Sequence, residues 1–146
     1  MADEIRCILL VDDDPDANHL HKFVIQQTFP VEQVHLAENG TDALQFLVSE
    51  PVDRLRPDLV FLDINMPGMD GWAFLDAMDQ LPADKREGIS VVMLTTSSDP
   101  TDRERALAHD QVCLYLTKPL TEDAFDELIQ QQFPSLCDQD SGQNLS

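Results

Sequence analysis

DLVFLDINMPGMDG, residues Asp58–Gly71, is the segment that best predicts the fold of this chain. Its first part, Leu59–Leu62, is a short and unbroken apolar run, a pattern typical of a strand buried on both faces of a sheet. The run ends at Asp63, and Pro67 and Gly68 then mark a turn. The segment therefore predicts a parallel strand that places a carboxylate at the edge of a helix-covered sheet.

Four further strands and five helices are predicted around this segment. The other strands are Ile8–Val11, Val34–Ala37, Val91–Leu94 and Val112–Leu116. The helices are Pro15–Gln27 after Asp14, Thr41–Val48, Gly71–Gln80, one that begins at Asp99–Pro100 and one capped by Thr121. We expect Val34–Ala37, which alternates with polar residues, at a sheet edge, and Leu81–Ser90 as a loop. Strands that alternate with helices in this way predict a doubly wound α/β domain.

Polar side chains follow the ends of four predicted strands: Asp12 and Asp13, Asp63, Thr95, and Lys118. In an open α/β sheet, ligands bind beyond the carboxyl ends of the strands. Clustered carboxylates repel one another unless they share a proton or hold a cation, and a few hard oxygen ligands favour Mg²⁺. We therefore expect a magnesium site where Lys118 and Thr95 bind a phosphoryl group that Asp63 accepts.

Each of these residues also has a purely structural interpretation. The run Asp12–Asp14 suits a helix N-cap with solvated neighbours, and Asp63 suits the start of a turn. Thr95 by itself is an ordinary β-branched strand residue, and Lys118 before a proline suits an exposed surface. The functional interpretation is favoured because all these positions coincide at strand ends.

The chain resembles the receiver domain of two-component response regulators. The resemblance rests on four blocks in order: Ile8–Asp14 (ILLVDDD), Asp58–Gly71, Val91–Thr95 (VVMLT) and Tyr115–Pro119 (YLTKP). It implies a flavodoxin-like (βα)5 fold, a five-stranded parallel sheet of order 2-1-3-4-5 with helices on both faces. It extends from about Arg6 to Gln132, and the Asp58–Gly71 block is the most specific part.

The resemblance also implies the metal ligands and the acceptor. Asp63 would be phosphorylated by a sensor histidine kinase or a phosphotransfer protein. Mg²⁺ would be bound by the carboxylates of Asp13 and Asp63 and by the backbone carbonyl of Asn65. Asp12 would contact the ion mainly through water.

Thr95 and Lys118 would bind the phosphoryl group, and Tyr115 matches the family's switch aromatic, whose ring position follows that of the threonine. Such a receiver catalyses its own phosphorylation and slow dephosphorylation and is not otherwise an enzyme. Three departures from the family pattern lie outside the acceptor and metal positions. Thr96 and Leu120 replace a frequent alanine and phenylalanine, and His109–Asp110 replaces a glycine before the fifth strand.

Two other families that use aspartates fit less well. A haloacid-dehalogenase-type phosphatase requires a second aspartate two residues after the nucleophile, where Asn65 follows Asp63. An EF-hand loop that begins at Asp63 requires a glutamate at its twelfth position, which is Phe74. A receiver fold used only for binding is disfavoured because the acidic, threonine and lysine positions are intact.

Length and charge limit the alternatives further. The 146 residues suit a receiver domain at 1–133 followed by a polar tail at 134–146, with no output domain. The formal net charge of −19 disfavours nucleic acid as a partner, and no segment is long and apolar enough for a membrane span. Three cysteines without metal spacing favour a reduced, cytoplasmic setting. We expect signalling through protein contacts, and the cognate kinase, the target and the oligomeric state stay open.

Overall fold

The computed structural model describes residues 5–29, 31–49, 56–66, 68–97 and 99–132. Its five strands are β1 (Cys7–Val11), β2 (Gln33–Ala37), β3 (Leu59–Leu62), β4 (Ser90–Thr95) and β5 (Val112–Thr117). Its helices are α1 (Pro15–Thr28), α2 (Gly40–Val48), α3 (Gly71–Asp79), α4 (Ala83–Arg86), α5 (Pro100–Leu107) and α6 (Glu122–Glu127), followed by the π-helical turn η1 (Leu128–Gln132). The predicted tail 134–146 and Pro67 lie outside the described residues.

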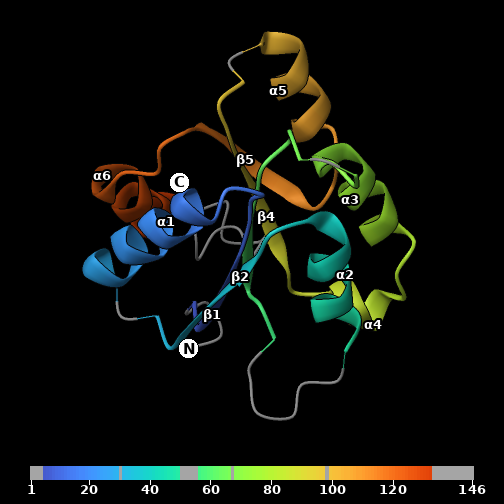
Figure 1. The fold of residues 1–146 in the computed structure, drawn as a ribbon, viewed down its shortest axis with the longest axis horizontal. Coiled ribbons are helices and arrows are strands. Elements are labelled where there is room, and N and C mark those ends of the chain that lie inside the picture. Colours follow the sequence, from blue (N-terminus) through green and yellow to red (C-terminus); the bar gives the residue numbers. More distant parts are fainter. Residues whose placement is uncertain (1–4, 30, 50–55, 67, 98, 133–146) are drawn as a thin grey trace.

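The strands form one parallel sheet in the order β2-β1-β3-β4-β5, with helices on both faces (Figure 1). This confirms the predicted flavodoxin-like architecture, with β2 at an edge. No helix in the described ranges is long and apolar enough to cross a membrane.

The buried core lies in two layers because alternate residues of each strand point to opposite faces. Leu9 and Val60 pack with α2, α3 and α5 on one face, and Ile8 and Phe61 pack with α1 and α6 on the other. Figure 1 shows α1 and α6 together on one side of the sheet and α2 and α3 on the other. The central strands β1 and β3 are buried throughout, as their continuous apolar runs predict.

Side-chain caps determine where most helices begin. The carboxylates of Asp14 and Asp99 and the hydroxyl of Thr121 accept from backbone N–H groups of the first turns of α1, α5 and α6. Asn39 and Asp70 do the same for α2 and α3. In the Asp12–Asp14 run, only Asp14 is the cap, which leaves its two neighbours for other contacts.

The prediction of a loop over Leu81–Ser90 was wrong in part, because the single-turn helix α4 lies within it. The Arg56 guanidinium donates to the carbonyls of Asp84 and Lys85, at 2.7 and 2.6 Å, and so satisfies carbonyls near the end of this helix. One turn is too short to give an apolar repeat, so local sequence does not indicate it. The turn at His109–Asp110 uses no left-handed residue, since no described residue other than glycine has a positive φ.

Candidate functional site

Backbone hydrogen bonds just beyond the strands align the predicted site residues at the edge of the sheet that is formed by the carboxyl ends of the strands. Asp12 N donates to Ala37 O at 3.1 Å, and Asp63 N donates to Val11 O at 3.1 Å. Lys118 N donates to Thr95 O at 2.8 Å. Because the strands are parallel and in register, these bonds bring side chains from four strand ends together.

Three carboxylates meet at this edge. Asp12, Asp13 and Asp63 each offer an oxygen, and these oxygens lie within 4.8 Å of one another. Asp12 and Asp63 are 4% and 6% exposed, whereas Asp13 is open to solvent. The Oδ1 atom of Asp63 is buried and has no hydrogen-bond partner among the described residues. A buried carboxylate oxygen without a partner is costly unless a cation or donor binds it.

Lys118 partly offsets the repulsion between these acids. Its Nζ pairs with Oδ2 of Asp12 and lies 3.0 Å from Oδ2 of Asp63. Burial by itself lowers the pKa of Lys118, but hydrogen bonds to Asp12 and Asp63 outweigh it and raise the pKa above its ordinary value. Three carboxylates against one ammonium leave surplus negative charge.

The donor chemistry of this cluster fits Mg²⁺. Its ligands are hard carboxylate oxygens, few in number, and the exposed side of Asp13 leaves room for water. The backbone carbonyl of Asn65, implied as a further ligand, belongs to an exposed residue two positions beyond Asp63.

Thr95 and Tyr115 are linked through a residue that sequence reasoning missed. Thr95 is fully buried, and its Oγ1 accepts from the N–H of Ser97 at 3.3 Å. The Tyr115 hydroxyl donates to the carbonyl of Ser97 at 2.9 Å. The link uses the backbone N–H and carbonyl of Ser97, and side-chain patterns in the sequence do not indicate which backbone groups will meet.

Two buried polar residues of α1 lie beneath the carboxylates and were also missed. Asn18 Nδ2 donates to Asp12 O at 3.0 Å, and its Oδ1 has no partner among the described residues. His21 is 2% exposed, and a small cavity lies between these two side chains and the ends of β1 and β4. Burial lowers the pKa of His21, the charge of Lys118 lowers it further, and Asp12 and Asp63 oppose them. Asn18, His21 and buried Ile25 follow one another at spacings of three and four residues along α1, and this spacing on one helix face was the sequence signal that could have identified the two polar residues as buried.

Gly71 allows α3 to begin close to the end of β3, where Asp63 lies. Its N–H donates to Ile64 O at 2.8 Å, and a Cβ here would lie 2.6 Å from Asp63 O and 2.8 Å from Ile64 Cα. Only glycine fits this approach without a shift of the backbone that carries Asp63.

Comparisons with known proteins agree with this geometry. The sequence model of the family described as the response regulator receiver domain matches residues 8–130. Protein PilH of Pseudomonas aeruginosa is 36% identical over 80% of this chain and 88% of its own length. The structure of a two-component response regulator from Cytophaga hutchinsonii is 35% identical, with a TM-score of 0.77 over 86% of this chain and 94% of that one. The Mn²⁺-bound response regulator Rcp1 is 31% identical, with a TM-score of 0.66 over 86% and 89%.

Proposed function

This chain belongs to the response regulator receiver family of two-component signalling, and we propose that it accepts a phosphoryl group on Asp63. The observation that carries the proposal is the set of contacts made by the two oxygens of the Asp63 carboxylate. Its Oδ2 is 3.0 Å from Lys118 Nζ, while its Oδ1 is buried and without a partner among the described residues. A carboxylate with one oxygen oriented by a cation and the other free suits a nucleophile.

The donor is a phosphohistidine of a sensor histidine kinase or of a phosphotransfer protein. The bond between phosphorus and the histidine nitrogen breaks as an Asp63 oxygen bonds to phosphorus. The electron pair of the broken bond stays on the nitrogen. The product is an aspartyl phosphate, so the chain labels itself and does not turn over other substrates.

Asp13, Asp63 and the Asn65 carbonyl hold Mg²⁺ in this proposal. When bound, the ion supplies charge that neutralises the phosphoryl oxygens. Both Asp12 oxygens already have protein partners, Lys118 and the N–H of Asp14, which supports a water-mediated role for Asp12. The relative Rcp1, whose structure is of the Mn²⁺-bound form, further supports the binding of a divalent ion.

Lys118 and Thr95 bind the new phosphoryl oxygens. Lys118 is placed to move from the carboxylates to the phosphoryl group, and Thr95, whose oxygen accepts from the Ser97 N–H, donates its own hydroxyl hydrogen as it is drawn toward the phosphoryl oxygens. Tyr115, tied to the same Ser97, then rotates inward and changes the surface made by α5, β5 and α6. A partner protein in the cytoplasm reads that surface.

The test is labelling with a small phosphodonor and Mg²⁺, followed by intact mass. The wild type should gain one acid-stable, base-labile phosphoryl group, and Asp63→Asn should gain none. Asp16→Asn, an exposed aspartate on α1, is the matched control and should label like the wild type. Equal labelling of Asp63→Asn would overturn the proposal.

A further inference from the structure

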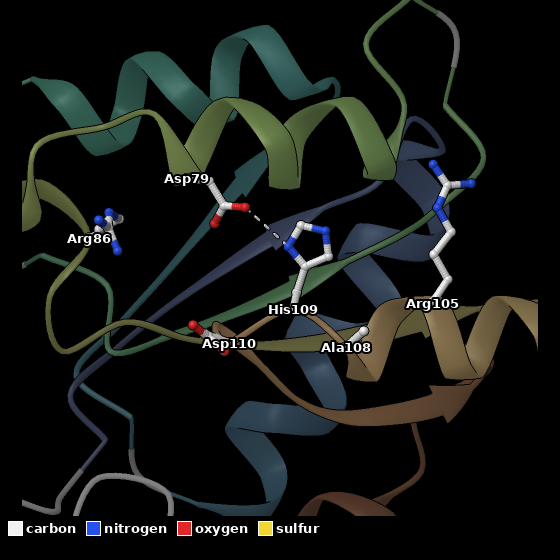
Figure 2. Close-up of a pocket in the computed structure, with 6 residues that line it drawn as sticks. All are labelled: Asp79, Arg86, Arg105, Ala108, His109 and Asp110. Atoms are coloured by element: carbon white, nitrogen blue, oxygen red, sulfur yellow. Dashed lines mark ion pairs between the residues drawn. The ribbon is translucent and has the colours of Figure 1, made fainter.

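A second group of metal-binding side chains lies between α3 and the turn from α5 to β5. It consists of Asp76, Asp79 and His109, whose donor atoms lie within 4.8 Å of one another. His109 Nδ1 is 3.4 Å from Asp79 Oδ2, and His109 Nε2 is 4.0 Å from Asp76 Oδ1. Figure 2 shows the Asp79 carboxylate and the His109 ring pointing toward each other across the gap between the two elements.

The backbone arranges these donors in advance. Asp76 and Asp79 are three residues apart on α3, so they project from the same side of the helix. His109 N donates to Ala106 O at 3.1 Å, and its carbonyl accepts from Val112 N at 3.1 Å. The His109 side chain is only 19% exposed, so the imidazole has little freedom to leave the position facing α3.

Asp79 and His109 line a surface pocket, and the two arginines that also line it contact other partners. The Arg105 guanidinium lies 4.2 Å from the centre of the Trp72 ring, and Figure 2 shows it extending away from His109. Arg86 Nε donates to Leu81 O at 3.1 Å. Asp110 lines the pocket as well and adds a further carboxylate near His109. The groups closest to the imidazole are therefore acidic.

We propose that Asp76, Asp79 and His109 bind a divalent transition-metal ion such as Zn²⁺ or Ni²⁺. An imidazole with carboxylates selects these ions, whereas the all-oxygen cluster at the strand ends selects Mg²⁺. A metal needs donors about 2.0–2.2 Å from it, so the carboxylates have to close in by rotation. The Asp76 and Asp79 side chains, 76% and 44% exposed, are free to do so, and water completes the coordination.

A metal here would join α3 to the α5–β5 turn. Trp72 is the only tryptophan in the chain and lies about one helical turn before Asp76. A paramagnetic ion such as Ni²⁺ at this site should therefore quench its fluorescence. The ordinary alternative is that a protonated His109 merely forms ion pairs with the two carboxylates.

The experiment titrates the full chain with Ni²⁺ in saturating Mg²⁺, which keeps the strand-end carboxylates occupied. Trp72 fluorescence should be quenched saturably, with one Ni²⁺ per chain by calorimetry. His109→Gln and Asp76→Asn should each lower the Ni²⁺ affinity about tenfold or more, because even residues that only orient metal ligands contribute roughly 10- to 100-fold.

His19→Gln is the matched control, an exposed histidine on α1, and should bind Ni²⁺ like the wild type. Asp76 is exposed, so Asp76→Asn tests the site even if the histidine variant does not fold. Absence of saturable quenching in the wild type would overturn the proposal and leave His109 as an ion-pair partner. Unchanged affinity in His109→Gln and Asp76→Asn would overturn it too, because the ion would then bind elsewhere. Neither outcome bears on phosphoryl acceptance by Asp63, which the labelling assay tests separately.

Discussion

Lys118 has two tasks that oppose each other in the same site. In the unphosphorylated chain it pairs with the nearly buried carboxylates of Asp12 and Asp63. In the proposed reaction it binds the phosphoryl group. Its ammonium offsets the negative charge of these two carboxylates, and the stability of the site depends on it.

Lys118→Ala should lower the free energy of unfolding by about 3 kcal/mol in EDTA, because two buried carboxylates lose their partner. Saturating Mg²⁺ should restore part of that loss, and Mg²⁺ affinity should not fall. The raised pKa means that the Lys118 contribution is complete at neutral pH and is lost only above pH 10.5. Urea denaturation with and without Mg²⁺ measures both effects, with Lys22→Ala on α1 as the control. A variant as stable as the wild type in EDTA would contradict this role.

His21 should make the fold sensitive to acid. Its pKa is lowered by burial, so below pH 6.5 the unfolded chain binds a proton that the folded chain resists. Stability should therefore fall as the pH drops through this range, by at most about 1.4 kcal/mol per pH unit. His21→Gln should flatten this dependence in urea denaturation, and His19→Gln, exposed on the same helix, should not. Identical slopes in both variants would show that His21 titrates as it does in the unfolded chain.

The loop between β4 and α5 connects three elements through Ser97. Its N–H reaches Thr95 on β4, and its carbonyl accepts from Tyr115 on β5. Its hydroxyl donates to Asp102 on α5 at 2.6 Å and accepts from Asp99 N at 3.3 Å. A rotation of the Thr95 hydroxyl therefore removes one of several bonds that hold this loop in place.

Tyr115→Phe should destabilise the unphosphorylated chain by about 1 kcal/mol, since it removes the hydrogen bond to Ser97. Beryllofluoride, which stands in for the phosphoryl group, should abolish this difference if the ring has turned inward. Urea denaturation with and without beryllofluoride measures both states. Ser97→Ala keeps the carbonyl that Tyr115 uses and serves as the control. An equal loss in both states would mean that Tyr115 does not move.

The whole molecule has a formal net charge of −19, with 28 acidic residues against 9 lysines and arginines. Three of the acidic residues, Asp12, Asp13 and Asp63, are clustered at the strand ends, and two of them are buried next to the core. A net negative charge of this size destabilises the compact state through repulsion between the acidic residues, and it attracts cations from solution.

Salt should therefore stabilise the chain. In EDTA, a change from about 10 mM to about 150 mM KCl shortens the Debye length from about 30 Å to about 8 Å and should raise the free energy of unfolding on the order of 1 kcal/mol. Choline chloride at the same ionic strength should give the same gain, since screening does not depend on the cation. A gain with KCl alone would indicate specific ion binding instead.

The sequence alone determined the five strands, the sheet order by resemblance, and the acids at the strand ends. These features could be predicted because burial on both faces leaves a continuous apolar run and because a parallel sheet brings its strand ends to one edge. The caps Asp14, Asp99 and Thr121 were also predicted, since a cap needs only the first turn of its own helix.

Only the tertiary structure decided the contacts between distant segments. Arg56 meets the carbonyls at the end of α4 across a gap of 28 residues, which no local pattern records. His21 lies under the carboxylates, and His109 faces Asp79, because helices pack at these positions on the sheet. Apolar periodicity says which face of a helix is buried, but which polar side chains meet there depends on how the helices pack in three dimensions.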